Sequence, residues 1–199
     1  MGKIADKLMQ FGELVTVKRG KPIYQTGEKI NSFYYIEKGI VKLAADSLDG
    51  KTTTISLNES NEFFGYLEYL KGCQEYTRYA VALTDCILYS MPIDLLHNPY
   101  IRESFIFDSL IQQLEKAEQL NFVLSTMTVP ERLRWLLLKM AKDKEGVLLI
   151  ESPLTHEEMA NYLGCSRQKI SNYLSKWKKD GALSYDSGII MIVDVEKLQ

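Results

Sequence analysis

The polar side chains best suited to binding a ligand lie in one short stretch, GCSRQKISNYLSKWKK, at residues 164–179. An arginine can bond the O6 and N7 atoms of guanine, and a glutamine or asparagine amide can bond the N6 and N7 atoms of adenine. A helix that carries such side chains on one face can therefore read base edges in the DNA major groove. The residues predicted to contact bases are Arg167, Gln168, Ser171 and Asn172.

The same stretch concentrates positive charge. It carries five Lys and Arg residues and no acid, although the whole chain has a net charge of -2. Each phosphate that a cation neutralises releases counterions, so these charges favour a contact with the DNA backbone on one face. The residues predicted to contact phosphates are Ser166, Lys169 and Lys176. The alternatives are a basic helix face that only meets solvent and a winged-helix module that binds another protein.

Local signals around this stretch predict two helices joined by a tight turn. Thr155 and Glu158 have the spacing of a capping box, so the first helix should begin at about residue 156. Gly164 supplies the left-handed residue that ends this helix. Ser166 then caps a second helix that reaches about Lys179. The pattern is that of a helix-turn-helix.

The segments flanking the two helices are predicted to complete a small domain. Pro130 occupies the first turn of a preceding helix, a favoured position for proline, and residues 147–150 form a short strand. After the second helix, residues 182–194 read as a hairpin around Asp186-Ser187-Gly188, which would form a wing. This hairpin is mostly apolar or acidic, so we expect it to contribute little contact with DNA.

A long helix is predicted over residues 101–127, which contain no glycine or proline. Its apolar residues alternate at spacings of three and four, as in a coiled-coil seam, and Asn121 fills one seam position. The predicted dimer seam is Phe107, Leu110, Leu114, Ala117, Asn121 and Leu124. The alternative is a helix that packs on its own domain.

The first hundred residues read as short strands. Runs of β-branched and aromatic residues at 33–36, 40–43 and 52–57 are separated by turn signals such as Lys38-Gly39 and Asp49-Gly50. Strands at spacings of about ten residues favour an antiparallel sandwich or barrel. The predicted class is therefore α+β, with a β-barrel domain at 1–98, a helix at 99–127 and a winged helix-turn-helix at 128–199.

Composition limits the cellular setting. No apolar run approaches the roughly 18 residues that would span a bilayer, and the N-terminus lacks the apolar core of a signal peptide. The three cysteines, Cys73, Cys86 and Cys165, form no C-x-x-C pair. We therefore expect a cytoplasmic protein with no membrane partner.

The order of these segments resembles the Crp/Fnr family of bacterial transcription regulators. VKRGKPIYQTGEKINSFYYIEKGIVKL resembles the first strands of the family's cyclic-nucleotide-binding-type jelly roll. EFFGYLEYL and QEYTRYAVALTDC resemble the two halves of its phosphate-binding cassette, and LGCSRQKISNYLSKWKKDGAL resembles its helix-turn-helix. The resemblance implies a homodimer that binds near-palindromic DNA and contacts RNA polymerase. The rival interpretation is a ligand-binding barrel protein whose helix-turn-helix serves protein contact.

The cassette departs from the cyclic-nucleotide-binding pattern. Tyr66 stands after Gly65 where the family has a ribose-binding Glu, and Tyr76 and Thr77 replace an Arg-Ser pair that holds the cyclic phosphate. A buried phosphodiester needs a cation, and Arg78, one residue along, should point to the opposite face of a strand. We expect no binding of cyclic AMP. The candidate effector pocket, Gly65, Tyr66, Tyr76 and Thr77, is either filled by aromatic rings or lined by them for another, unknown effector.

Other chemistry has little support in the sequence. An iron-sulfur cluster usually takes four cysteines, and the two histidines, His97 and His156, do not suggest a haem or metal site. No serine, cysteine or carboxylate constellation suggests catalysis. We expect no cofactor, no metal and no enzymatic activity. A thiol switch at Cys73 is the less favoured alternative.

Overall fold

The computed structural model describes residues 11–150, 154–186 and 189–198. They form two compact units, here called the N-terminal and C-terminal units, which divide between Ala117 and Glu118 inside a long helix. The absence of a signal peptide was expected largely from residues 1–10, which lie outside the described residues.

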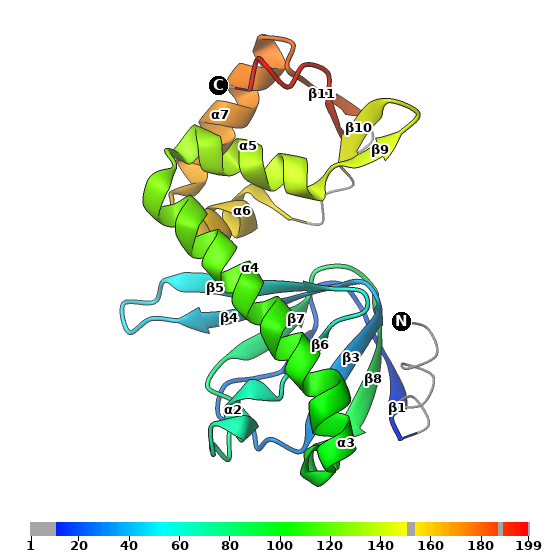
Figure 1. Cartoon of the computed structure of the whole chain (residues 1–199). Coiled ribbons are helices and arrows are strands. Elements are labelled where there is room, and N and C mark those ends of the chain that lie inside the picture. Colours follow the sequence, from blue (N-terminus) through cyan, green and yellow to red (C-terminus); the bar gives the residue numbers. More distant parts are fainter. Residues whose placement is uncertain (1–10, 151–153, 187–188, 199) are drawn as a thin grey trace. The chain divides into compact units, whose positions relative to one another are not determined.

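The N-terminal unit contains two four-stranded antiparallel sheets, ordered β1-β8-β3-β6 and β2-β7-β4-β5 (Figure 1). Their strands are β1 Glu13–Val17, β2 Pro22–Tyr24, β3 Ser32–Lys38, β4 Ile40–Asp46, β5 Thr52–Glu59, β6 Phe63–Phe64, β7 Tyr79–Ala82 and β8 Cys86–Pro92. The sheets stay separate instead of closing into one continuous barrel. Their arrangement is consistent with the predicted jelly roll.

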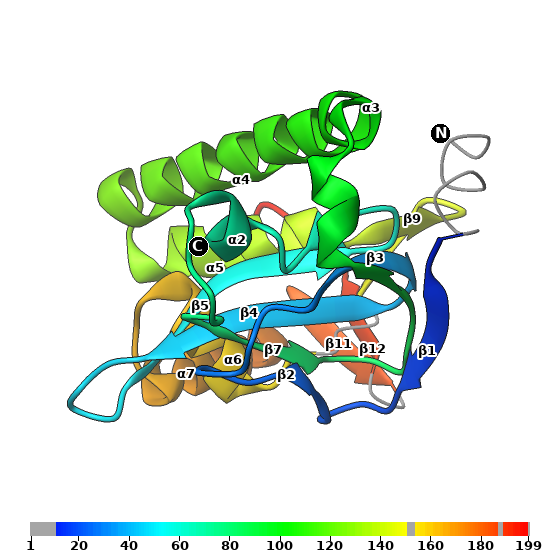
Figure 2. The same cartoon turned by 90° about the horizontal axis from the view of Figure 1, so that it is seen from below.

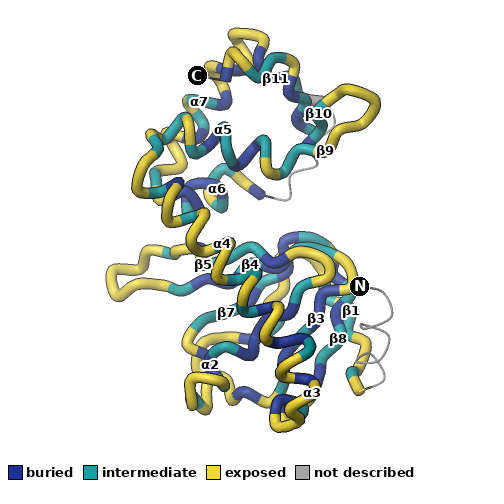
Figure 3. Tube along the Cα trace, in the orientation of Figure 1, coloured by how far each residue is buried: buried dark blue, intermediate teal, exposed yellow. Residues whose placement is uncertain are grey.

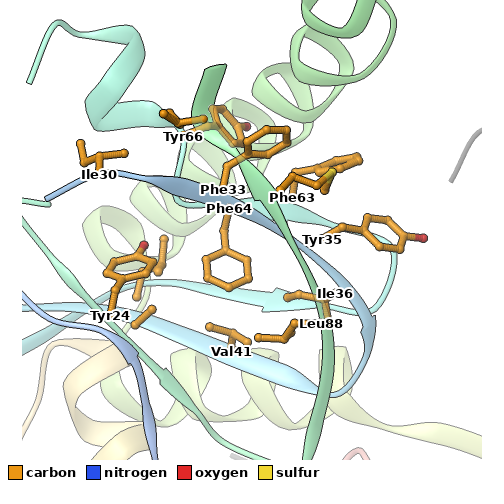
Figure 4. Packing of buried hydrophobic residues seen from close by; sticks show 14 of the residues in the cluster. Tyr24, Ile30, Phe33, Tyr35, Ile36, Val41, Phe63, Phe64, Tyr66 and Leu88 are labelled. Atoms are coloured by element: carbon orange, nitrogen blue, oxygen red, sulfur yellow. The ribbon is translucent and has the colours of Figure 1, made fainter. Parts of the chain in front are cut away.

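The core of this unit is formed by aromatic and branched side chains from both sheets. Phe33, Val41, Phe64 and Leu88 are fully buried. Figure 4 shows Val41, Phe64 and Leu88 between the two layers of strands, and Phe33 beside Phe63 and Tyr66 on the other side of β3. Gly39 joins β3 to β4 with a φ of 113°, and a Cβ there would lie 2.6 Å from a cysteine sulfur. Only glycine fits this turn.

A helical segment follows the last strand. It consists of the 3-10 turn Ile93–His97, α3 Pro99–Ile101, a π-helical turn Arg102–Ile106 and α4 Phe107–Thr126. The predicted helix over 101–127 is confirmed, although its π-helical start was not anticipated. Figures 1 and 2 show the short helix α2, Leu67–Leu70, beside the first half of α4. Phe105 and Ile106 are buried in the sheet core.

The C-terminal unit contains the end of α4, three further helices and one four-stranded antiparallel sheet. The helices are α5 Val129–Met140, α6 His156–Leu163 and α7 Arg167–Lys179. The sheet has the order β11-β12-β10-β9, with strands β9 Lys142–Lys144, β10 Val147–Ile150, β11 Leu183–Asp186 and β12 Ile189–Ile192. The predicted wing pairs as β11 and β12, but its turn at Ser187 and Gly188 lies outside the described residues.

Candidate nucleic-acid interface and effector pocket

The first helix of the predicted pair begins with the expected capping box. The Thr155 hydroxyl accepts a hydrogen bond from the Glu158 backbone N–H at 3.2 Å, and the Glu158 carboxylate accepts one from the Thr155 backbone N–H at 2.8 Å. Gly164 ends α6 in the left-handed region at a φ of 62°. The sequence signals therefore set both ends of this helix.

The second helix, α7, separates an apolar face from a polar one. Ser166 caps it by accepting a hydrogen bond from the Lys169 backbone N–H at 3.4 Å. Ile170, Leu174 and Trp177 are buried at spacings of four and three, so they fix the helix against its own unit. Figure 3 shows exposed and buried residues alternating along α7. The opposite face remains available to a ligand.

The predicted contact residues mostly lie on that exposed face. The exposed members are Ser166, Arg167, Gln168, Lys169, Asn172 and Lys176. Ser171 is partly buried, and its hydroxyl lies 2.9 Å from His156 Nδ1 at the start of α6. The amide nitrogen of Gln168 donates to the amide oxygen of Asn172 at 2.7 Å. Contacts with bases and phosphates remain predictions.

Arg132 on α5 is a structural residue that the sequence reasoning missed. Its guanidinium donates to the carbonyl oxygens of Leu124 at 2.7 Å, Met127 at 2.9 Å and Leu163 at 3.1 Å. These carbonyls lie at or near the C-terminal ends of α4 and α6, where helices leave carbonyls without helical partners. Arg132 therefore ties the end of α6, at the turn of the helix-turn-helix, to the end of α4. No local spacing signals it, because one partner lies 31 residues away.

The predicted dimer seam on α4 is partly exposed. Phe107 and Leu114 are 61% and 60% exposed, and Ala117 and Asn121 are exposed as well. The two remaining seam residues are only partly exposed: Leu110, which packs against the sheet core, and Leu124, in the C-terminal unit. Figure 3 shows much of α4 as exposed. The neighbouring Ile111 and Phe122, outside the predicted seam, are also exposed.

Tyr66, in the candidate effector pocket, belongs to the core of the N-terminal unit. Its side chain is fully buried, and its hydroxyl donates to Ser109 Oγ on α4 at 2.8 Å. Burial raises the pKa of Tyr66 to about 12. Gly65 precedes it with a φ of 81°. A ribose would have to displace an aromatic ring whose hydroxyl already has a partner.

Tyr76 is likewise held by the chain itself. Its hydroxyl donates to the Ser32 carbonyl oxygen at 2.6 Å, and its ring stacks on Tyr24 with centroids 3.7 Å apart. Burial raises its pKa above the ordinary tyrosine value. Tyr34 and Phe64 extend the stack. These aromatic rings fill space at the cassette.

Arg78 does not point away from the cassette, which corrects the sequence-based expectation. Its Nε atom lies 2.9 Å from Glu68 Oε1, and the Thr77 hydroxyl donates to the same oxygen at 3.2 Å. Alternation fails because Thr77 and Arg78 precede β7, where the backbone is not yet a strand. Glu68 is almost fully buried, so the guanidinium beside the cassette is neutralised by a carboxylate. The sequence reasoning missed Glu68, since its partner lies ten positions away.

Among the described residues, no cluster of three or more His, Cys, Asp and Glu side chains could hold a metal ion. None of the helices in that part of the chain is long and apolar enough to cross a membrane. Cys73, Cys86 and Cys165 are free thiols.

Comparisons with known proteins match both units. Residues 14–98 match the model of the cyclic nucleotide-binding domain, and residues 131–199 match the model of the Crp-like helix-turn-helix domain. The global nitrogen regulator of Synechococcus elongatus is 28% identical over 87% of this chain and 79% of its own length. The CRP-like cAMP-activated global transcriptional regulator of Mycobacterium tuberculosis is 26% identical over 92% of this chain and 85% of its own.

A solved structure agrees with these matches. A CRP/FNR-family transcriptional regulator from Thermus thermophilus superposes with a TM-score of 0.75 and 26% identity, covering 94% of this chain and 96% of that one. The two domain models match in the order in which the units occur, and the relatives align across both of them. The chain therefore belongs to the Crp/Fnr family of transcription regulators.

Proposed function

We propose that this regulator acts as a homodimer that reads a near-palindromic DNA site, with one α7 helix in the major groove of each half-site. Residues 128–199 bind DNA, residues 99–127 form the dimer helix, and residues 1–98 form an effector-type domain. The dimer acts on the bacterial chromosome in the cytoplasm by contacting RNA polymerase. It performs no chemistry on the DNA.

The exposed polar face of α7 carries this proposal. Ser166 caps the helix and three apolar residues anchor it, so its first turns are held rigidly while their side chains stay exposed. Arg167 suits guanine, and Gln168 and Asn172 suit adenine. Ser171 is the fourth residue proposed to contact bases. Ser166, Lys169 and Lys176 are proposed to contact phosphates, which favours binding at low salt.

The exposed apolar side chains of α4 support the dimer. Phe107, Ile111, Leu114 and Phe122 are large hydrophobic residues with at least 43% of their surface exposed. Side chains of this kind on one helix favour association with a second apolar surface. A second copy of α4 supplies one by symmetry, with the seam Phe107, Leu110, Leu114, Ala117, Asn121 and Leu124.

We further propose that cyclic AMP does not control this chain. Tyr66 and Tyr76 fill the cassette, and Glu68 already neutralises Arg78. A cyclic phosphate there would face a buried carboxylate instead of an unpaired cation. Calorimetric titration of the full chain with cyclic AMP should give no binding heat, and micromolar affinity would overturn this part of the proposal.

Selection of bound fragments from random DNA tests the function. We expect an inverted repeat whose half-sites lie about 10 base pairs apart, the spacing of one helical turn. Analytical ultracentrifugation should show a dimer under the same conditions. A monomer with no sequence preference at moderate ionic strength would overturn the proposal.

A further inference from the structure

Two of the side chains proposed to read bases are bonded to each other. Gln168 and Asn172 lie four residues apart on α7, so they share one face of the helix. The Gln168 Nε2 atom donates to Asn172 Oδ1 at 2.7 Å, and both residues are exposed. This bond uses one donor hydrogen of Gln168 and one lone pair of Asn172 Oδ1, so the two amides are coupled when they meet a base.

An amide pair of this kind presents a fixed pattern of donors and acceptors. Each amide has one carbonyl oxygen and one NH2 group. When the NH2 of one bonds the oxygen of the other, the pair keeps one carbonyl oxygen and one NH2 group with full capacity for a ligand. The pattern is the same whichever amide donates, so the pair offers one acceptor on one amide and one donor group on the other.

Adenine is the base whose major-groove edge complements this pattern. It presents the N7 acceptor beside the N6 amino donor, whereas guanine presents two acceptors, cytosine one donor and thymine one acceptor with a methyl group. We infer that Gln168 and Asn172 together read one adenine in each half-site, as a single unit. This inference rests on the proposed function, and it specifies the base that the site must contain.

The surroundings of the pair support a shared contact. The His156–Ser171 bond joins α6 to α7. Ile170 and Leu174 are buried on the opposite face of α7, so the backbone that carries both amides is held in place. The first turn of α7 contains no acid that would compete for the amide donors. The pair can therefore meet a base edge with its internal bond intact, which lowers the ordering cost of binding.

Site selection with matched variants tests the inference. The full chain, Gln168→Ala, Asn172→Ala, the double variant and the control Asn161→Ala are each selected against random DNA, with circular dichroism to verify folding. We expect both single variants to lose the adenine preference at the same half-site position, with affinity for the wild-type site falling about tenfold. The double variant should bind about as weakly as either single variant, and the control should match the wild type.

Gln168→Glu provides a second and sharper test. A carboxylate at this position can still accept from the Asn172 amide, but its remaining oxygen can only accept. Carboxylates accept from the N4 amino group of cytosine. The preferred base at this one position should therefore change from adenine to cytosine, which a merely structural role for the pair would not produce.

The outcomes separate the inference from the proposed function. If the wild type selects a site but the two alanine variants relax different positions, or if no adenine is preferred, the joint reading is overturned and the DNA-binding proposal stands. A wild type that selects no sequence overturns both.

Discussion

Polar side chains occur at two places where the family binds a ligand: the cassette of the N-terminal unit and the first turns of α7. They differ in exposure to solvent and in the partners that they already have. Tyr66 and Tyr76 are buried, and their hydroxyls bond Ser109 and a backbone carbonyl of the same unit. Arg167 and its neighbours on α7 are exposed. Polar groups that are buried and already paired stabilise the fold, whereas exposed ones on a rigid element can serve a ligand.

The cassette and α7 also differ in the charged side chains that they carry. Beside the cassette, the Arg78 guanidinium faces the buried Glu68 carboxylate. On α7, five cations occur between residues 164 and 179 with no acid among them. An anion therefore meets an arginine paired with a carboxylate at one site and a sequence cluster of five cations at the other. Both regions keep a local resemblance to the family, but only the second keeps the electrostatics of an anion-binding surface.

Breaking the buried ion pair should have the largest effect. Arg78→Met leaves the Glu68 carboxylate buried without its cation, and we expect the N-terminal unit to lose roughly 3 kcal/mol of stability. Labelling of the buried Cys86 thiol during urea unfolding measures this, since Cys86 lies in the core of that unit. The exposed Lys18–Asp85 pair is the control, and Asp85→Ala should destabilise the unit much less than Arg78→Met does. Equal costs would show that the cassette pair is not structural.

Removing the proposed guanine contact should have the next largest effect, on DNA binding instead of stability. Arg167→Ala should cost about 1–3 kcal/mol on the selected site and little on random DNA. Fluorescence anisotropy with both DNAs measures the difference, and exposed Lys38→Ala on β3 serves as the control. An equal loss on both DNAs would make Arg167 a phosphate contact, and no loss would favour a helix-turn-helix that binds protein.

Alkaline pH should have a smaller effect, a loss of stability in the N-terminal unit, which contains the cassette. Burial holds the pKa of Tyr66 at about 12, above the value of 10.0 expected when the chain is unfolded. The stability that the neutral hydroxyl contributes is complete below pH 10 and is lost as pH rises from about 10 toward 12. At pH 11 the loss from Tyr66 should be about 1 kcal/mol.

Tyr66→Phe isolates this contribution, because phenylalanine does not ionise. Labelling of Cys86 gives the loss of unfolding free energy between neutral pH and pH 11 for each protein. This loss should be smaller for the variant than for the wild type by about 1 kcal/mol. The only tryptophans, Trp135 and Trp177, belong to the C-terminal unit, so their fluorescence reports on that unit separately. Identical pH profiles for the wild type and the variant would contradict the buried-hydroxyl interpretation.

The sequence was most informative where structure is set by near neighbours. The Thr155–Glu158 capping box, the left-handed Gly164 and the Ser166 cap all act within four residues, and the structure confirms each of them. Strand β9 was not predicted, because Lys142–Lys144 has no apolar pattern and is a strand only through its pairing with β10. The expectation for Arg78 was wrong, because it assumed a strand that begins one residue later.

The sequence by itself determined the family, the two kinds of domain and the exposed polar face of α7, since caps, glycines and apolar spacing depend on residues that are close along the chain. Only the tertiary structure showed that the tyrosine hydroxyls of the cassette are already hydrogen-bonded within their own unit. Tyr66 finds Ser109 43 positions away, and Tyr76 finds the Ser32 carbonyl 44 positions away. Whether a polar side chain is free to bind a ligand depends on the partners that folding brings to it, and spacing along the chain does not reveal those partners.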